Sequence, residues 1–146
     1  HRDLHSFPTR RSSDLTNCPI IKYSTPICTT GDDSEALGIG NGKIPDDNLS
    51  ASSVLDDTCG AARGRLNIAA EGDLKAAWCA LENDENQWIQ VDCGKVVRLT
   101  QVATQGRGDD ENQRVTSFCV LYSNNGHIFI PFRENGEIKV LQISKS

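Results

Sequence analysis

The stretch that decides the fold is Gln87-Trp88-Ile89-Gln90-Val91-Asp92-Cys93-Gly94, or QWIQVDCG. Ile89, Val91 and Cys93 alternate with polar residues, so their side chains point to one face of an extended chain. This alternation predicts a half-buried β-strand that ends at the glycine. The segments on either side of this strand can be interpreted relative to it.

Four further segments read as strands separated by turn signals. We expect Phe118, Val120 and Tyr122 to share one face, and Ile128, Ile130 and Phe132 to align in the same way. Asn-Gly pairs at 125–126 and 135–136 favour tight hairpin turns. The segments are Val96–Thr104, Val115–Ser123, His127–Phe132 and Glu137–Ile143. Closely spaced strands and turns predict an antiparallel β-sandwich or barrel.

Composition narrows the classes of function. The chain has 146 residues, a net charge of −5 and six cysteines, and no Cys-x-x-Cys pair. A length of this order suits one domain. The acidic balance argues against nucleic acid, because phosphate neutralisation needs a basic face. No run approaches the ~18 apolar residues of a membrane span. Six cysteines suit a secreted chain better than a cytosolic one.

The two ends of the chain differ from its middle. Residues 1–15 include HSFPTRRSSDL, which resembles the translation of a sequencing adapter, and we interpret them as a non-native segment. Residues 16–35 read as an irregular lead-in, with two cysteines and two prolines. The remaining residues, 36–146, are expected to form the domain, and its secretory signal is expected to be missing from this sequence.

The sequence shows no catalytic constellation. Outside residues 1–15 the only histidine is His127, beside a turn, and no nucleophile motif accompanies it. Acidic doublets such as Asp46-Asp47 and Asp56-Asp57 could bind a hard cation, but none has EF-hand spacing and solvated turns explain them better. We therefore expect no enzyme activity, no metal and no cofactor.

Seven short motifs, in order, resemble the discoidin family, also called the coagulation-factor C-type or F5/8 type C domains. They are Ala36-Leu37-Gly38-Ile39 with Gly42–Asp46, Leu49–Ser53, Arg65-Leu66-Asn67, Ala77-Trp78-Cys79-Ala80, Gln87–Asp92, Val102–Arg107, and Val115–Phe118 with Tyr122-Ser123. The resemblance implies an all-β, jelly-roll-like antiparallel sandwich of the galactose-binding type. The family pattern continues beyond Val140, so we expect the domain to be incomplete at its C-terminus.

The resemblance also implies a function. Family members grip partners through loops at one end of the sandwich, which here correspond to Ser52–Thr58, Leu81–Asn86 and Gly106–Gln113. We expect an extracellular adhesion module that binds a glycan or matrix protein. The alternatives are a phospholipid-binding module, ranked lower because the loops are acidic, and an accessory domain of a larger secreted enzyme. The candidate ligand-binding residues are Val54, Leu55, Asp56, Asp57, Asn67, Glu82, Asn83, Asp84, Arg107, Asp109 and Asp110.

Several of these residues have a simpler interpretation. Arg107 corresponds to an arginine that binds collagen in some family members, but we favour a structural arginine tied to a carboxylate or to carbonyl groups. Arg107-Gly108-Asp109 also spells RGD, the tripeptide that integrins read, although the family motif already accounts for the arginine, so integrin binding is not favoured. Asn67 could simply satisfy a turn.

Two modifications follow from sequence position. Cys59 and Cys79 both lie between candidate strands, and their disulfide would close a loop of about 20 residues. Cys18 with Cys28 is a second possible pair, and spacing alone does not decide between pairings. Asn48-Leu49-Ser50 is an N-glycosylation sequon, suited to a secreted chain unless burial blocks it.

Overall fold

The computed structural model describes residues 3–6, 20–24, 36–110 and 112–143. The main sheet has the strand order β10-β6-β2-β4-β3, and β7 also pairs with β6. Its strands are β2 (Ile20–Ser24), β3 (Leu49–Ala51), β4 (Trp88–Val91), β6 (Ser117–Ser123), β7 (Ile130–Pro131) and β10 (Val140–Gln142). Strands β3 and β4, β6 and β10, and β6 and β7 pair antiparallel. The predicted antiparallel all-β class is confirmed.

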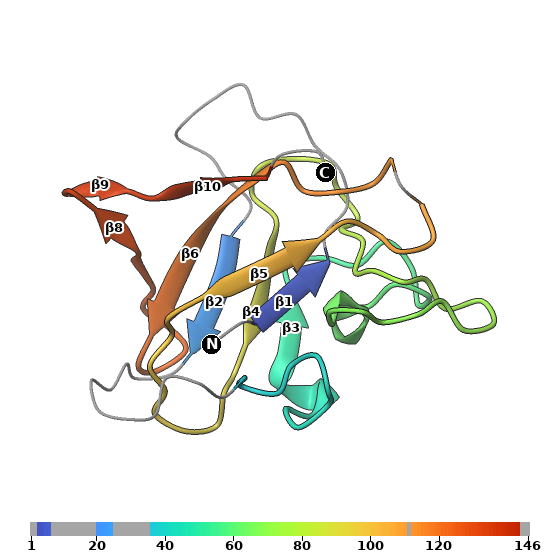
Figure 1. Ribbon diagram of the computed structural model, residues 1–146, viewed down its shortest axis with the longest axis horizontal. Coiled ribbons are helices and arrows are strands. Elements are labelled where there is room, and N and C mark those ends of the chain that lie inside the picture. The colour runs from blue at the N-terminus through green and yellow to red at the C-terminus, as the bar shows by residue number, and fades with distance from the viewer. Residues whose placement is uncertain (1–2, 7–19, 25–35, 111, 144–146) are drawn as a thin grey trace.

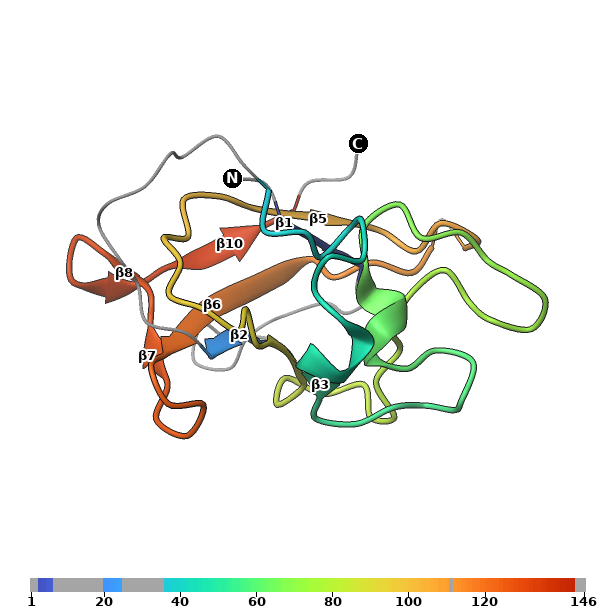
Figure 2. The same ribbon diagram turned by 90° about the horizontal axis from the view of Figure 1, so that it is seen from below.

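A second layer crosses one face of this sheet (Figures 1 and 2). It contains β5 (Val102–Gln105), which pairs in parallel with β1 (Asp3–Ser6). Between the layers lies a core that includes Ile89 and Val91, both 0 % exposed, as the alternation predicts. The other members of the core are Ile39, Ile44, Leu49, Trp78, Val115, Phe118 and Val120. The arrangement is a β-sandwich, and the helical residues described are two short 3-10 turns, Asp46–Asn48 and Ala61–Gly64, neither long enough to cross a membrane.

The N-terminal region differs from the expectation of an irregular lead-in over residues 16–35. Within it, Ile20–Ser24 is strand β2, which lies between β4 and β6 and runs parallel to both. The hydrogen-bonding edges of β4 and β6 are thereby satisfied by a segment far away in sequence. β-branched Ile20 and Ile21 favour an extended chain, a local signal that the flanking prolines obscured. Cys18 and Cys28 lie outside the described residues.

The C-terminal strands are shorter than predicted. The segment Glu137–Ile143 divides into β9 (Glu137–Ile138) and β10, and β9 forms a hairpin with β8 (Arg133–Glu134). The Asn135-Gly136 turn of this hairpin has φ of 53° and 84°, the left-handed values that its residues favour. By contrast, the Asn125-Gly126 pair does not close a tight hairpin, because the Asn125 side chain accepts hydrogen bonds from the backbone of His127 and Ile128.

The predicted return strand His127–Phe132 forms only over Ile130–Pro131, and the apolar side chains that the sequence aligns there are exposed. Ile128, Ile130 and Phe132 are 70 %, 50 % and 48 % exposed. The return strand pairs with β6 over only two residues, and one of them is Pro131, which has no N–H to extend the ladder. The segment is therefore an edge, not a core strand.

A buried arginine holds the N-terminal loop of the described domain against the core. Arg65 is 8 % exposed, and its guanidinium donates to the carbonyl oxygens of Ile39 (2.5 Å) and Ile44 (2.8 Å). It also forms an ion pair with Asp46 at 2.6 Å. The fork geometry of a guanidinium suits three acceptors that converge in this way. Arg65, the first residue of the Arg65-Leu66-Asn67 motif, therefore has a structural role.

Replacing Arg65 with alanine should strongly destabilise the domain, because buried carbonyl oxygens would lose their donors. We expect the free energy of unfolding to fall by about 3–5 kcal/mol in urea denaturation. Lys95→Ala, at an exposed site, is the control and should change it by no more than about 0.5 kcal/mol. Equal effects of the two variants would contradict the structural role.

Candidate functional site

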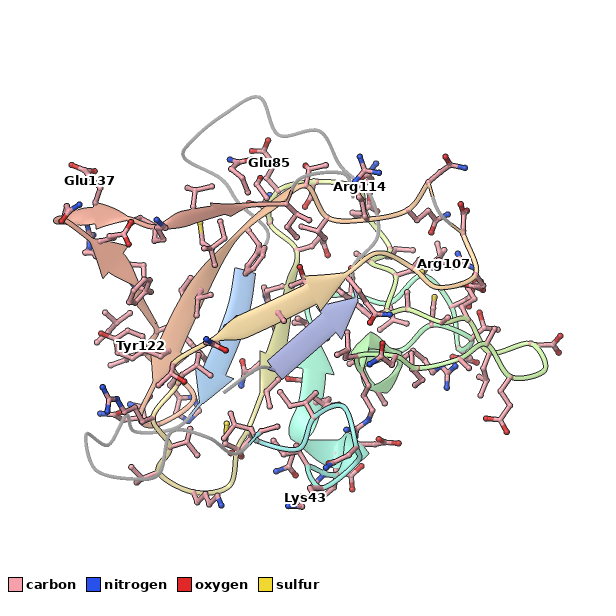
Figure 3. The ribbon with its side chains drawn as sticks, viewed as in Figure 1. Lys43, Glu85, Arg107, Arg114, Tyr122 and Glu137 are labelled. Carbon is pink, nitrogen blue, oxygen red and sulfur yellow. The ribbon has the colours of Figure 1, made fainter. Side chains whose placement is uncertain are left out.

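The three candidate loops lie at one end of the sandwich. Loop 1 (Ser52–Thr58) follows β3, and loop 2 (Leu81–Asn86) leads into β4; the two strands are antiparallel, with Ala51 opposite Ile89. Loop 3 (Gly106–Gln113) follows β5 and reaches the segment Lys75–Cys79, where the backbone N–H of Ala76 donates to Asp109 Oδ1 at 3.4 Å. Lys75 in turn donates its backbone N–H to Thr58 of loop 1 at 2.9 Å. Figure 3 places Glu85 and Arg107 along this end, with Lys43 far from them.

Two serines and a glutamine join the bases of loops 1 and 2. The hydroxyls of Ser52 and Ser53 donate to Gln87 Oε1 at 2.7 and 2.6 Å. The same hydroxyls accept backbone N–H groups from Trp88 and Leu81, each at 3.0 Å. We call Ser52, Ser53 and Gln87 the serine–glutamine junction. Its hydrogen bonds fix loop 1 relative to loop 2, and therefore fix the surface that the two loops present.

Trp78 supports the junction from the core. Its side chain is 1 % exposed, and its Nε1–H donates to the carbonyl oxygen of Ser53 at 2.9 Å. A buried indole needs an acceptor for this N–H. The two motifs that contain Trp78 and Ser53 are thus parts of one interaction.

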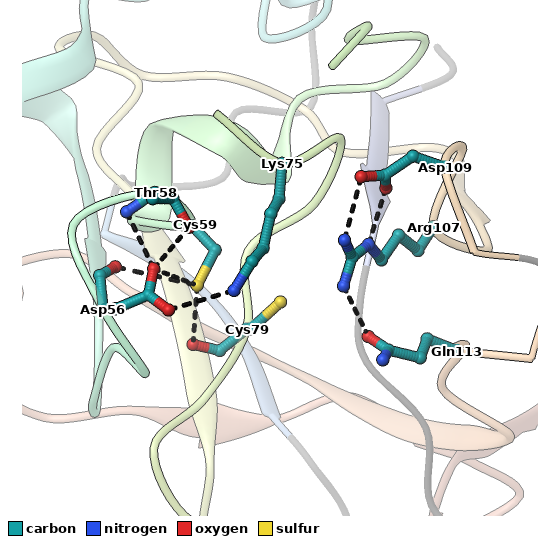
Figure 4. Close-up of polar contacts among 8 residues, drawn as sticks. All are labelled: Asp56, Thr58, Cys59, Lys75, Cys79, Arg107, Asp109 and Gln113. Carbon is teal, nitrogen blue, oxygen red and sulfur yellow. Dashed lines mark hydrogen bonds and ion pairs between the residues drawn. The ribbon is translucent and has the colours of Figure 1, made fainter. Parts of the chain in front are cut away.

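Loop 1 exposes an apolar pair beside a paired aspartate. Val54 and Leu55 are 38 % and 47 % exposed. Asp56 accepts from the backbone and hydroxyl of Thr58 and pairs with Lys75 Nζ at 3.0 Å (Figure 4). These hydrogen bonds hold the pKa of Asp56 well below its usual range, with the Thr58 hydroxyl contributing most. Asp57 is exposed.

In loop 2, the structure adds a residue that sequence reasoning missed. Leu81 is 55 % exposed, and its backbone N–H donates to the hydroxyl of Ser53, the residue directly before the Val54-Leu55 pair. Glu82 and Asn83 are exposed beside it. Asp84 instead turns back, accepting from the backbone of Asn86 and the side chain of Gln87, both at 2.8 Å. A leucine directly before an acidic run was the available signal for Leu81.

In loop 3, the two charged residues of the RGD tripeptide pair with each other. The Arg107 guanidinium contacts both carboxylate oxygens of Asp109, at 2.6 and 2.8 Å, and donates to Gln113 Oε1 at 3.0 Å. Arg107 lowers the pKa of Asp109 to about 2. The Arg107 side chain is only 13 % exposed. This geometry supports the structural interpretation of Arg107 and leaves neither charge extended for an integrin. Asp110 likewise accepts a local backbone N–H, from Asn112 at 3.0 Å.

Asn67 lies near loop 3 but has a turn conformation. Its φ is 56°, a left-handed value that asparagine tolerates, and its backbone N–H donates to Gln105 Oε1 at 3.0 Å. Its side chain is exposed. The turn explanation accounts for the residue without a ligand.

Cys59 and Cys79 are buried thiols beneath loop 1. The backbone N–H of Cys79 donates to the carbonyl of Cys59 at 3.1 Å, so the two residues lie directly opposite each other. Burial, together with the neighbouring Cys59 thiol, raises the pKa of Cys79 to about 11.

A polar hollow of about 390 Å³ lies at the opposite end of the sheet from the three loops. Its lining is Asp47, Asn48, Ser50, Gln90, Asp92, Asn124, Asn125 and Gly126. Asn48 donates its side-chain N–H to the carbonyl of Asp92 at 2.9 Å, and Asp92 and Asn125 cap their own turns. Much of the lining thus has partners within the chain. The hollow does leave space beside the Asn48 sequon.

His127 is exposed next to its turn. No group of three histidine, cysteine or acidic side chains in the described part of the chain could hold a metal ion.

The chain is similar to proteins that contain domains of the resembled type. The family model "F5/8 type C domain" matches residues 48–145. Bovine coagulation factor V is 32 % identical over 127 residues, covering 84 % of this chain and 6 % of the relative. Mouse lactadherin is 35 % identical over 127 residues, covering 84 % and 27 %, and human neuropilin-1 is 33 % identical over 111 residues, covering 74 % and 12 %. The chain thus spans a small part of each relative. No solved structure matches it significantly.

The Arg107–Asp109 pair predicts a pH dependence of stability. The pKa of Asp109 is lower in the folded chain than the value of about 4 expected in the unfolded chain. Its contribution is therefore complete above pH ~4 and is lost as the pH falls towards 2. Asp109→Asn should have a lower free energy of unfolding than the parent at pH 7, measured by urea denaturation. The difference between the two proteins should become smaller as the pH is lowered. Asp73→Asn, at an exposed site, should show no such narrowing.

Asn48 should carry an N-glycan when the chain passes through a eukaryotic secretory pathway. The hollow gives the glycan room, and a glycosylated amide keeps one N–H for the Asp92 carbonyl. Treatment with peptide N-glycosidase should lower the mass of the secreted protein and leave that of Asn48→Gln unchanged. An identical mass before and after treatment would rule the site out.

Proposed function

Because the chain belongs to the F5/8 type C (discoidin) domain family, we propose that it is an extracellular, non-catalytic recognition module that binds a matrix protein through loops 1 and 2. The observation that carries the proposal is the exposed cluster of Val54, Leu55 and Leu81 at the end of a rigid sandwich. Apolar side chains held in loops by a fixed scaffold are typical of a contact surface. We call these three residues the apolar loop cluster.

The charges around the cluster indicate what kind of surface would bind it. Asp57 and Glu82 are exposed next to it. The nearby cations Lys75 and Arg107 are already paired with Asp56 and Asp109. A partner with an apolar contact and basic side chains complements this surface, because opposite charges steer and orient an encounter.

Glycan and phospholipid ligands fit less well. Loops 1, 2 and 3 contain no aromatic residue on which a sugar ring could stack. Anionic lipid would be repelled by the exposed carboxylates, while burial of Val54 and Leu55 in a bilayer would gain only about 1.5–3 kcal/mol each.

The test is direct binding of the purified chain to a panel of matrix proteins, a glycan array and vesicles with and without phosphatidylserine. We expect binding to a matrix protein, weakened at least about tenfold by Val54→Ser/Leu55→Ser, since loss of a central apolar contact costs more than about 1 kcal/mol. Binding should also weaken as salt is raised.

Val96→Ser is the matched control, because Val96 is 50 % exposed but lies beyond the opposite end of β4. It should bind like the parent chain. Binding confined to glycans or to phosphatidylserine vesicles, or binding that the double variant leaves intact, would overturn the proposal, as would binding to none of the panel.

A further inference from the structure

Two buried thiols lie at the base of loop 1, where no part of the proposed contact surface requires them. Cys59 is 0 % exposed and Cys79 is 3 % exposed, and with Ala77 they form a small cluster separate from the main core. Apolar residues of similar size would fill the same space. Packing alone therefore does not explain why two cysteines occupy this position.

The backbone places the two residues for a covalent link. Cys59 and Cys79 lie opposite each other through the 3.1 Å hydrogen bond from the Cys79 N–H to the Cys59 carbonyl. Cys59 Sγ reaches to 4.0 Å from the Cys79 carbonyl oxygen, and the two thiols interact directly. Backbones in direct hydrogen-bond contact bring their Cα atoms into the range that a disulfide spans.

We propose that Cys59 and Cys79 form a disulfide that fastens loop 1 to the segment Lys75–Cys79. The oxidant is a small-molecule disulfide such as oxidised glutathione. The thiolate of one cysteine attacks it and releases one glutathione thiol; the second cysteine then attacks the mixed disulfide and releases another. Two protein thiols are oxidised, and one glutathione disulfide is reduced to two thiols.

The bond would make a set of weak contacts permanent. Without the bond, three contacts hold loop 1 to this segment. The Leu55 N–H donates to the Cys79 carbonyl at 2.9 Å, and the Lys75 N–H donates to the Thr58 carbonyl. The third contact is the Asp56–Lys75 ion pair (Figure 4). Each is modest near solvent. A covalent link among them would pre-organise Val54 and Leu55 and reduce the ordering cost of binding. The bond itself stands on geometry; its effect on recognition rests on the proposed function.

The surroundings indicate a structural bond, not a labile one. Both sulfurs are buried, so a reductant would have difficulty reaching them. In the reduced chain, burial and the Cys59 thiol hold Cys79 in its neutral form, which is a poor nucleophile. We therefore expect the disulfide to form while the chain folds and to persist afterwards.

The test is disulfide mapping of the full chain, folded in a mixture of reduced and oxidised glutathione. Remaining thiols are blocked with N-ethylmaleimide, and trypsin then cuts after Arg63 and Lys75, which separates the two cysteines. We expect peptides 44–63 and 76–95 to be linked and to separate on reduction. Peptide 76–95 also contains Cys93, so the mapping is repeated on Cys93→Ser, which should keep the link. The same oxidation in urea should give no preference for this pair.

Stability and binding give two independent readouts. Reduction by a phosphine in urea, followed by refolding with the phosphine present, should lower the Tm of the parent by about 10 °C more than that of Cys59→Ala/Cys79→Ala. Both peptides labelled with maleimide, or Cys79 linked to another cysteine, would overturn the bond. If the bond forms but the double variant binds its matrix protein as the parent does, the bond stands and its effect on recognition is wrong. Failure to bind any matrix protein would instead count against the proposed function.

Discussion

The contact between Trp78 and Ser53 is the constraint on which the loop surface depends. The indole is buried in the core, and its N–H donates to the backbone carbonyl of Ser53, where loop 1 begins. The Ser53 hydroxyl then holds both Gln87 and the backbone of loop 2. Core packing and loop position are therefore one continuous network, in which a shift of the tryptophan would move both loops together. Buried polar networks of this kind specify a single arrangement only when every member has its partner.

Alternation in the sequence correctly marked the core-facing residues of β4 and β6, although in β6 Ser117 and Cys119 on the other face are buried as well. Ile89, Val91, Phe118 and Val120 are buried as predicted, because one face of β4 and β6 meets the second layer. The same pattern misled at Ile128, Ile130 and Phe132. Alternation reports that a segment has an apolar face, but whether another layer covers that face depends on distant pairing, and Pro131 limits that pairing here.

The sequence also could not predict how β2 pairs. Its pairing partners lie in β4 and β6, and such long-range registers leave no trace in local periodicity. The directions of the loop side chains could not be predicted from the sequence either. The family resemblance implied that loops 1, 2 and 3 lie at one end, as they do. The direction of each side chain, however, depends on its partners: Arg107 turns to Asp109 and Asp84 turns to Gln87, while Leu81 points outward. The candidate residues of these loops differ in exposure: Val54, Leu55 and Glu82 are exposed, while Arg107 is held in an ion pair.

The uncovered edge near β7 has a practical consequence for the purified chain. Ile130 of the short edge strand β7 and the flanking Ile128 and Phe132 are exposed there, and no charged residue lies between them in the sequence. Such an edge can recruit a second molecule by strand pairing. At high concentration the isolated chain is expected to precipitate or oligomerise through this flank, and a solubilising lysine in place of Ile128 would improve its colloidal behaviour without touching the sandwich interior.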